Sequence, residues 1–331
     1  MAIVWEWIDN PIIGGMLTGS AIILYLKLIS YVQANQDYRL SDSYKKTLAL
    51  VEDLDPGAAE IEYPGNVTLS NLHYFWFAPT LTYQIAFPMS PRVRIWRVLG
   101  FIKDLALTTV LLLFIQGQVV APNVEKLLKD VEANDGYYSW HILAEYGLKL
   151  SIASTYVWLL FFFIFFHQYL NILAELLRFG DRVFYKDWWN AAETSAYWRL
   201  WNSPVHYWLV RHLYFPCVRV GASKALASFV VFFVSAVFHE VLVAIPFHMV
   251  PIRPWAFIGM LMQVPLTMFT KALMKRFPGS SIGNIMFWIC FCFIGQPMAV
   301  LMYAIDYRYG NQEQFDLTAK KPLIRIFGGE L

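Results

Sequence analysis

The stretch ALASFVVFFVSAVFHEVLVAIPF, residues 225–247, decides the fold class of this chain. A helix needs about 20 predominantly apolar residues to cross the hydrocarbon core of a bilayer, and this stretch is long enough. An ionisable pair, His239 and Glu240, lies inside it, and a charged side chain at that depth costs on the order of a few kcal/mol or more. Either a neighbouring helix satisfies the pair, or His239 is a proton-transfer group held in a membrane cavity.

The composition of the whole chain agrees with a membrane protein. Of its 331 residues, 58% are hydrophobic and 15% are charged, and the mean hydropathy is +0.45. Soluble domains are nearer to about 45–50% apolar and about 25% charged. The apolar runs are continuous rather than alternating, which argues against an outer-membrane barrel. A net charge of +2 without a basic tract gives no indication of nucleic-acid binding, and three cysteines predict neither a disulfide framework nor a zinc site.

Six apolar segments predict an all-α polytopic membrane protein with six or seven spanning helices in a single membrane-embedded domain, residues 1–331. The segments are residues 12–33, 99–121, 148–177, 225–247, 255–274 and 283–305. The third has about 30 residues, more than one crossing needs at about 1.5 Å per residue, so we expect it to tilt, to project or to contain a break. The N-terminus lacks the basic region of a cleavable signal, so the first apolar segment would direct insertion.

Lysine and arginine counts predict the orientation of the chain. Residues 34–103 and 178–224 carry seven basic residues each and residues 271–282 carry three, whereas residues 121–147 carry two and residues 246–256 carry one. By the positive-inside rule, the first, third and fifth connections are cytosolic, and both termini face the opposite side.

Two of these cytosolic connections, residues 34–98 and 178–224, are too long to be turns. In the second, Ser203 can cap a helix that has Pro204 at its first position. We expect this helix to be amphipathic and to lie in the membrane interface. Its apolar face would consist of Val205, Trp208, Leu209 and His212. Asn66 opens a glycosylation sequon, which a cytosolic position would leave unused.

His239 is the first candidate for chemistry. A neutral imidazole is the common side chain best suited to general-base work near neutral pH. On a helix, Ser235 lies one turn before His239 and shares its face, whereas Glu240 points about 100° away. One isolated histidine does not specify a reaction.

The segment FYKDWWN, residues 184–190, has a structural and a functional interpretation. Asn190 could be a helix N-cap, with Glu193 completing a capping box, and the two tryptophans could anchor the chain in the membrane interface. Asn202 is either a turn residue before the proline-initiated helix or a polar group aimed into a cavity.

Several polar residues lie in or beside the apolar segments. Gln263 and Gln296, each near a proline, either form interhelical hydrogen bonds or line a polar cavity. Arg211 and Lys224, at the predicted cytosolic edge, would meet either phosphates or lipid headgroups. A polar stripe on the third segment, typical of a helix seam, consists of His167, Asn171 and Glu175.

Four motifs occur in a specific order along the chain. They are FYKDWWN (184–190), WNSPVH (201–206), SAVFHE (235–240) and IGQPMAVLMY (294–303). Together they resemble the membrane-bound O-acyltransferase (MBOAT) superfamily, in its acyl-CoA:sterol/diacylglycerol branch, whose signature is FYxDWWN. MQVPL and IGQPMAVLMY are similar to the diacylglycerol O-acyltransferase type 1 group. Val241 stands where that group usually has tyrosine, and the family usually has further N-terminal segments, so we expect an incomplete or a reduced chain.

The resemblance implies an MBOAT-like fold around an intramembrane reaction chamber, and acyl transfer from acyl-CoA to 1,2-diacylglycerol to give triacylglycerol. His239 would be the general base and Asn202 its polar partner. The supporting residues would be Glu240, which orients or tunes His239, and the amides Gln263 and Gln296. Residues near acyl-CoA would be Trp201, His206, Tyr214, Lys224 and Ser235. The signature motif contributes Phe184, Tyr185, Asp187, Trp188, Trp189 and Asn190.

The resemblance also implies partners and a location. The partners would be acyl-CoA, diacylglycerol and membrane lipid, with a homo-oligomer (a dimer or a tetramer) in the endoplasmic reticulum membrane. Neither a metal nor a cofactor is required, because acyl-CoA is a substrate. Two alternatives stay open: a sterol or fatty-alcohol acceptor in the same chemistry, and a transporter that uses His239 in a proton relay. A transporter would be expected to show internal repeats, and the sequence shows none.

Overall fold

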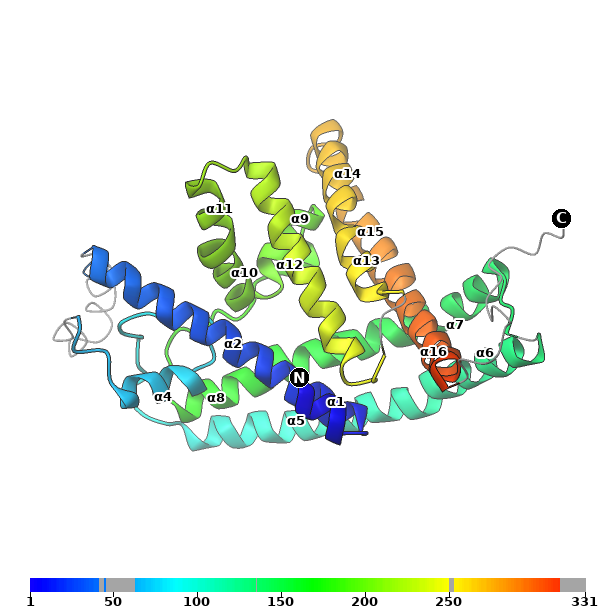
Figure 1. Cartoon of the computed structure of the whole chain (residues 1–331), viewed down its shortest axis with the longest axis horizontal. Coiled ribbons are helices and arrows are strands. Elements are labelled where there is room, and N and C mark those ends of the chain that lie inside the picture. The colour runs from blue at the N-terminus through cyan, green and yellow to red at the C-terminus, as the bar shows by residue number, and fades with distance from the viewer. Residues whose placement is uncertain (42–44, 46–62, 135, 250–252, 316–331) are drawn as a thin grey trace.

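The computed structural model describes residues 1–41, 45, 63–134, 136–249 and 253–315, and helices dominate it (Figure 1). Six helical stretches are long and apolar enough to cross a membrane, which confirms the six predicted segments. They are Pro11–Leu40, Ile95–Ala133, Trp140–Leu176, Lys224–Ala244, Trp255–Arg276 and Ile282–Tyr309. Among the described residues, the β-type pairing is limited to one antiparallel bridge, between Met89 and Phe179.

The helices are short pieces joined into longer rods. The α-helices are α1 (Ala2–Trp7), α2 (Pro11–Leu40), α4 (Leu69–Phe77), α5 (Ile95–Ile115), α6 (Ala121–Ala133), α7 (Trp140–Phe162), α8 (Leu170–Leu176), α9 (Thr194–Leu200), α10 (Ser203–Leu209), α11 (Phe215–Arg219), α12 (Lys224–Ala244), α13 (Trp255–Leu261), α14 (Gln263–Arg276), α15 (Ile282–Phe287) and α16 (Gln296–Phe315). Wider π-helical segments are η2 (Gln116–Val120), η3 (Phe163–Tyr169), η5 (Val210–Tyr214) and η6 (Trp288–Gly295), and η4 (Trp188–Asn190) is a 3₁₀ turn.

Proline accounts for three of the four π-helical segments. Pro122, Pro216 and Pro297 each lie two residues after the end of η2, η5 and η6 respectively. A proline lacks the N–H that a helix needs, and its ring clashes with the carbonyl four residues back, so a wider turn accommodates it. η3 has no such proline and lies in the third spanning segment, where the helix widens locally without ending.

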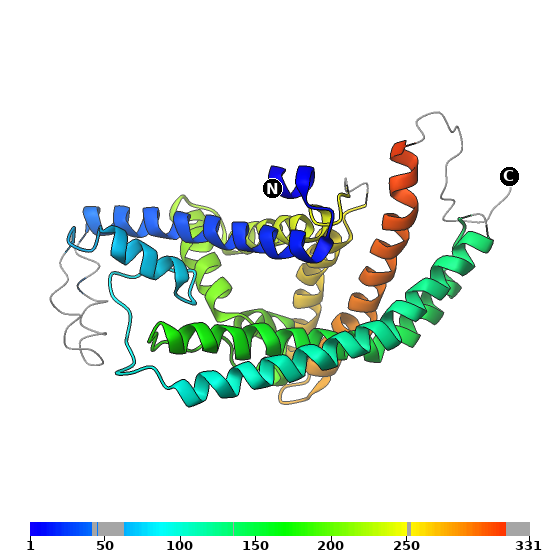
Figure 2. The same cartoon turned by 90° about the horizontal axis from the view of Figure 1, so that it is seen from below.

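The spanning helices do not form one parallel bundle. α2 and the antiparallel pair formed by α5–α6 and α7–α8 lie on opposite sides of the molecule (Figure 2). α12 and the α13–α14 rod run at a steep angle to that antiparallel pair (Figure 1). α12 packs against α13, α2 and η5, so the helix that carries His239 stands in the middle of the molecule.

Contacts between connections group three of them on one side. The backbone N–H of Ser90 in the first connection donates to the carbonyl oxygen of Arg178 in the third (2.6 Å). Asn284, in the first turn after the fifth connection, donates from Nδ2 to the carbonyl oxygen of Trp189 in the third (2.8 Å). The first, third and fifth connections therefore share one side, as the counts of basic residues predicted. That this side is the cytosol remains a prediction from the charges.

The remaining connections meet on the other side. Arg253 in the fourth connection donates to the hydroxyl of Tyr138 in the second (3.2 Å). The ring of Trp5, before the first spanning helix, lies 5.5 Å from the ring of His248 in the fourth connection. The observed grouping therefore agrees with the alternation predicted for six crossings.

The helix after the signature motif starts differently from the prediction. Asn202, not Ser203, is the N-cap of α10, because the Oδ1 atom of Asn202 accepts the N–H of Val205 (3.2 Å) and Ser203 already has helical geometry. The predicted apolar face exists, but it packs against α2 rather than facing lipid. Trp208 is buried there and donates from Nε1 to the carbonyl oxygen of Leu26 (2.8 Å).

The predicted capping box at Asn190 is also wrong. Asn190 closes the turn η4, and α9 begins only after Glu193, which makes no side-chain capping bond. The amide of Asn284 donates to the carbonyl oxygens of Trp189 (2.8 Å) and Ala191 (3.0 Å). These two bonds hold the chain extended past Asn190, so a helix cannot start there.

Candidate functional site

The geometry around His239 determines which of its ring nitrogens can act. Nδ1 lies 2.7 Å from the carbonyl oxygen of Ser235 and 3.5 Å from the Ser235 hydroxyl. A carbonyl oxygen can only accept, so in the neutral ring Nδ1 carries the proton. Nε2 then keeps its lone pair. In the structure of this single chain, His239 is an exposed residue. This is the protonation state and the access that a general base requires.

Glu240 is fastened to two other helices. It is buried, and its Oε2 atom accepts the backbone N–H of Phe257 (3.1 Å) and the hydroxyl of Tyr303 (2.9 Å). The Tyr303 hydroxyl in turn accepts the N–H of Ala256 (2.7 Å). The carboxylate thus sits at the first turn of α13, where free N–H groups favour an anion. Glu240 therefore ties α12 to α13 and α16 at the residue that follows His239.

The signature motif holds Asn202 from both sides. Before it, the N–H of Lys186 donates to the carbonyl oxygen of Leu200 (2.8 Å). After it, the N–H of Ser203 donates to the carbonyl oxygen of Phe184 (3.0 Å). These two backbone bonds fix the junction between α9 and α10, so the position of Asn202 depends on the position of the motif.

The neighbours of Asn202 are packed or half-buried. The indole of Trp201 stacks on that of Trp158, with 5.3 Å between the ring centroids. Burial, and then the charge of Arg199, lower the pKa of His206 below its ordinary value. His206 is therefore a neutral ring in the resting protein at neutral pH.

Part of the signature motif is aromatic core. Trp188 is 1% exposed and packs against rings from α7, α9 and η6. The Tyr185 hydroxyl lies 2.7 Å from Nδ1 of His167, which ties the motif to η3. Phe184 is buried, whereas Trp189 is 41% exposed. The buried rings therefore anchor the motif, whereas its polar side chains are exposed: Lys186, Asp187 and Asn190.

The two amides lie on different helices from the base. Gln263 is buried at the start of α14; its Nε2 donates to the carbonyl oxygen of Gly259 (3.3 Å), and its Oε1 has no partner among the described residues. Gln296 is half-buried and is the first residue of α16. Within the described part of the chain, no hydrogen bond joins these amides or Asn202 to His239.

Of the two cations predicted to meet phosphates or lipid headgroups, one is engaged within the protein. Arg211 donates to the carbonyl oxygen of Tyr83 (3.0 Å) and lies 3.9 Å from the carboxylate of Asp37. Lys224 is exposed at the first position of α12, after the cap residue Ser223. Only Lys224 of this pair keeps its charge open to a ligand. Tyr214, the other residue matched to acyl-CoA here, closes η5.

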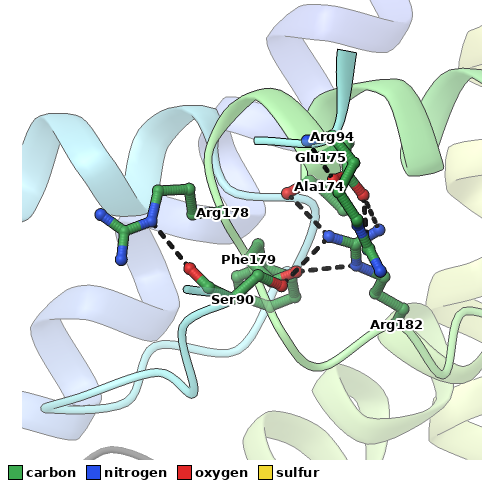
Figure 3. Close-up of polar contacts among 7 residues, drawn as sticks. All are labelled: Ser90, Arg94, Ala174, Glu175, Arg178, Phe179 and Arg182. Carbon is green, nitrogen blue, oxygen red and sulfur yellow. Dashed lines mark hydrogen bonds and ion pairs between the residues drawn. The ribbon is translucent and has the colours of Figure 1, made fainter. Parts of the chain in front are cut away.

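The polar stripe on the third segment is a helix seam at two of its three positions. His167 bonds to Tyr185, and Glu175 is fully buried between Arg94 and Arg182 (Figure 3). Asn171 instead donates to the carbonyl oxygen of His167 in its own helix (2.7 Å). In the sequence, both arginines belong to the basic residues that predict orientation, and no local pattern indicates their shared partner.

Two further buried polar groups escaped the sequence analysis. Lys27, inside the first spanning helix, donates from Nζ to the carbonyl oxygens of Phe75 (2.8 Å), Trp76 (3.0 Å) and Ala78 (2.6 Å). His212, predicted to lie on an apolar helix face, is buried and bonded on both ring nitrogens. An ionisable residue at an apolar position was the available signal in both cases.

The fold and these residues define a class: a polytopic helical membrane protein with an accessible histidine at mid-helix and side-chain amides on other helices of the same core. The chain belongs to the MBOAT, membrane-bound O-acyltransferase, family, whose sequence model matches residues 7–305.

Within this family, the chain is similar to several proteins that share the name diacylglycerol O-acyltransferase. Over 300 residues the chain is 47% identical to "Diacylglycerol O-acyltransferase 1C" of Glycine max. The matched region is 90% of this chain and 56% of the relative. It is 44% identical over 284 residues to "Diacylglycerol O-acyltransferase 1" of Arabidopsis thaliana (86% and 51% covered). The protein of that name from Dictyostelium discoideum is 39% identical over 307 residues (92% and 47% covered). The chain spans about half the length of the curated relatives it matches.

Proposed function

We propose that this protein transfers an acyl group from acyl-CoA to the free hydroxyl of 1,2-diacylglycerol and so makes triacylglycerol. Family membership supports acyl transfer to an oxygen, and the names of the relatives support diacylglycerol as the acceptor. The observation that carries the proposal is the bond from Nδ1 of His239 to the Ser235 carbonyl oxygen, which leaves Nε2 as a proton acceptor.

In this mechanism, Nε2 of His239 takes the hydroxyl proton as the alcohol oxygen attacks the thioester carbonyl. The new C–O bond forms, the C–S bond breaks, and the proton passes to the departing CoA thiolate. An alcohol with a pKa far above 7 needs such a base within hydrogen-bond reach. A side-chain amide from Asn202, Gln263 or Gln296 donates to the developing oxyanion, and loss of one such donor costs about 10²–10³ in rate.

We place the protein in the endoplasmic reticulum membrane as a multi-pass homo-oligomer. Acyl-CoA is water-soluble, and it enters from the side of the first, third and fifth connections. Four of the five residues that match acyl-CoA positions in the family lie on the third connection, and Ser235 lies inside α12. Lys224, exposed at the start of α12, is a cation there that a CoA phosphate can reach.

The test is a transfer assay with purified, reconstituted protein and radiolabelled oleoyl-CoA. Diacylglycerol, a sterol and a fatty alcohol are offered in parallel, and we expect labelled triacylglycerol to be the main product. A preference for the sterol or the fatty alcohol would show that this alcohol, and not diacylglycerol, is the acceptor. Ester formation with none of the three, from protein that still binds acyl-CoA, would overturn the enzymatic proposal.

A further inference from the structure

A buried ion cluster joins the first and third connections immediately before the signature motif (Figure 3). Its centre is Glu175, near the end of α8, whose side chain is fully buried. Arg94 donates to Oε1 from its backbone N–H (2.8 Å) and from Nε (2.7 Å), and it donates to Oε2 from a terminal nitrogen (2.7 Å). Arg182 donates to Oε2 (2.5 Å). We call these three residues the Glu175 cluster.

The guanidinium of Arg182 is too fully engaged to bind a substrate phosphate. Its Nε donates to the carbonyl oxygen of Phe179 (2.9 Å). Its second terminal nitrogen lies 3.3 Å from the Ser90 hydroxyl and 3.5 Å from the carbonyl oxygen of Ala174. All three nitrogens of Arg182 therefore have partners inside the protein, so the role of this arginine is to hold position.

Backbone bonds beside the cluster keep the two connections in register. The N–H of Gly180 donates to the carbonyl oxygen of Pro88 (2.7 Å), and the N–H of Ser90 donates to that of Arg178 (2.6 Å). A Cβ atom built on Gly180 would lie 2.7 Å from the Pro88 oxygen, so only glycine allows this approach. These bonds therefore fix the position of the segment that carries Arg182 relative to the first connection.

The position of Arg182 affects the position of Asn202, because only a few residues and backbone hydrogen bonds connect them. Phe184 follows Arg182 by two residues, and its carbonyl oxygen accepts the N–H of Ser203 (3.0 Å), the residue after Asn202. The N–H of Lys186 fixes the other side of the same junction. If Arg182 moves away from Glu175, the motif loses the buried ion pair that anchors the segment just before it, and Asn202 shifts with the motif.

We propose that Glu175 is a positioning residue for acyl transfer: its buried carboxylate holds Arg182, and through the signature motif it sets the place of Asn202 and of the neighbouring acyl-CoA residues. This inference rests on the proposed function for its kinetic consequences. A shift of about 1 Å in a reacting site can cost about 10²-fold in rate, so a modest displacement is sufficient.

The central test is Glu175→Gln, which keeps the shape of the side chain but removes the charge that both arginines share. We expect kcat/KM for acyl-CoA to fall about 10²-fold, with a higher KM for acyl-CoA and an unchanged KM for diacylglycerol. The matched control is Glu145→Gln on the same helical rod. Glu145 forms an exposed pair with Lys149 (2.6 Å), and its loss should leave both KM values unchanged.

A milder variant covers the case in which Glu175→Gln does not fold. Arg182→Lys keeps the positive charge but loses the planar fork, and we expect an intermediate rise in KM for acyl-CoA. Arg182→Gln should show the full effect, so partial rescue by lysine separates positioning from simple loss of folded protein. Unchanged KM values in both arginine variants, with kcat per folded molecule within twofold of the parent, would overturn the proposal.

Hydrogen exchange provides a measurement that does not depend on the reaction. Glu175→Gln should accelerate amide exchange across residues 182–206 by tenfold or more and leave α7 unchanged. Equal exchange in parent and variant would remove the positioning role. If the parent protein fails to form any ester, the proposed function falls, and the exchange result still decides whether Glu175 positions the motif.

Discussion

At the scale of single residues, the proton on His239 decides what α12 can do. The Ser235 carbonyl oxygen fixes that proton on Nδ1, so Nε2 can accept one from an alcohol. We expect His239→Ala to lower kcat by about 10²–10⁴-fold while the protein still folds and inserts. The measurement is steady-state transfer, with folded protein quantified by size-exclusion chromatography.

A matched control accompanies this variant. His141→Ala, at an exposed position in the first turn of α7, should have no effect. A His239→Ala protein that retains more than a tenth of the parent kcat would show that another group takes the proton.

His212 makes folding sensitive to acid. Nδ1 bonds to the Gln33 amide oxygen (2.6 Å) and Nε2 to the Ser30 hydroxyl (2.8 Å), which also accepts the N–H of Tyr83. Burial, and then the charge of Arg211, lower the pKa of His212 from about 6.5 to about 4. As the pH falls through this window, the unfolded chain binds a proton that the folded protein does not, so stability decreases.

The prediction is a comparison of melting temperatures between pH 7.5 and pH 4.5. The parent protein should lose stability as the pH falls below about 6.5. His212→Gln should be less stable at pH 7.5 and should lose less on acidification, because glutamine does not titrate. Parallel pH profiles for the two proteins would assign the acid sensitivity to other groups.

At the scale of elements, Lys27 closes the end of α4. A helix leaves its last carbonyl groups without partners, and Nζ of Lys27 bonds to three of them in and after the last turn of α4. A cation is also favoured at a helix C-terminus by the helix dipole. The spanning helix α2 is thereby fixed to the first connection at a buried point.

Lys27→Met should therefore destabilise the protein, although methionine suits an apolar helix. An unsatisfied buried acceptor costs about 1–3 kcal/mol, so we expect a loss of at least about 2 kcal/mol. Lys149→Met, at an exposed position of α7, serves as the control and should change stability by less than about 0.5 kcal/mol. Equal melting temperatures for the two variants would contradict a stabilising role for Lys27.

Some of these elements were visible in the sequence and others were not. The spanning segments follow from local composition, since the bilayer sets their length. The prolines that follow η2, η5 and η6 were also visible, although only the last of them, Pro297, entered a prediction, as the proline near Gln296. The cap of α10 was misplaced by one residue, because adjacent Asn202 and Ser203 are both good caps and only the backbone geometry chooses between them.

At the scale of the whole molecule, the polar contacts that fix the fold join distant parts of the chain. Arg94 and Glu175 are 81 residues apart, and no local pattern pairs them. His212 looked like one position on an apolar stripe because its partners, Ser30 and Gln33, belong to another helix. His239 was found because an ionisable residue in a long apolar run is informative by itself.

The membrane topology can be predicted by combining the distribution of basic residues with the contacts in the structure. Charges predict that the first, third and fifth connections are cytosolic, and contacts show that these connections share one side. In a background without native cysteines, single cysteines replace exposed residues: Val183→Cys in the third connection, Phe277→Cys in the fifth and Tyr137→Cys in the second. A membrane-impermeant maleimide should label the first two in sealed, cytosolic-side-out vesicles. The cysteine at position 137 should react only after the membrane is permeabilised, and its labelling in sealed vesicles together with position 183 would be incompatible with six crossings.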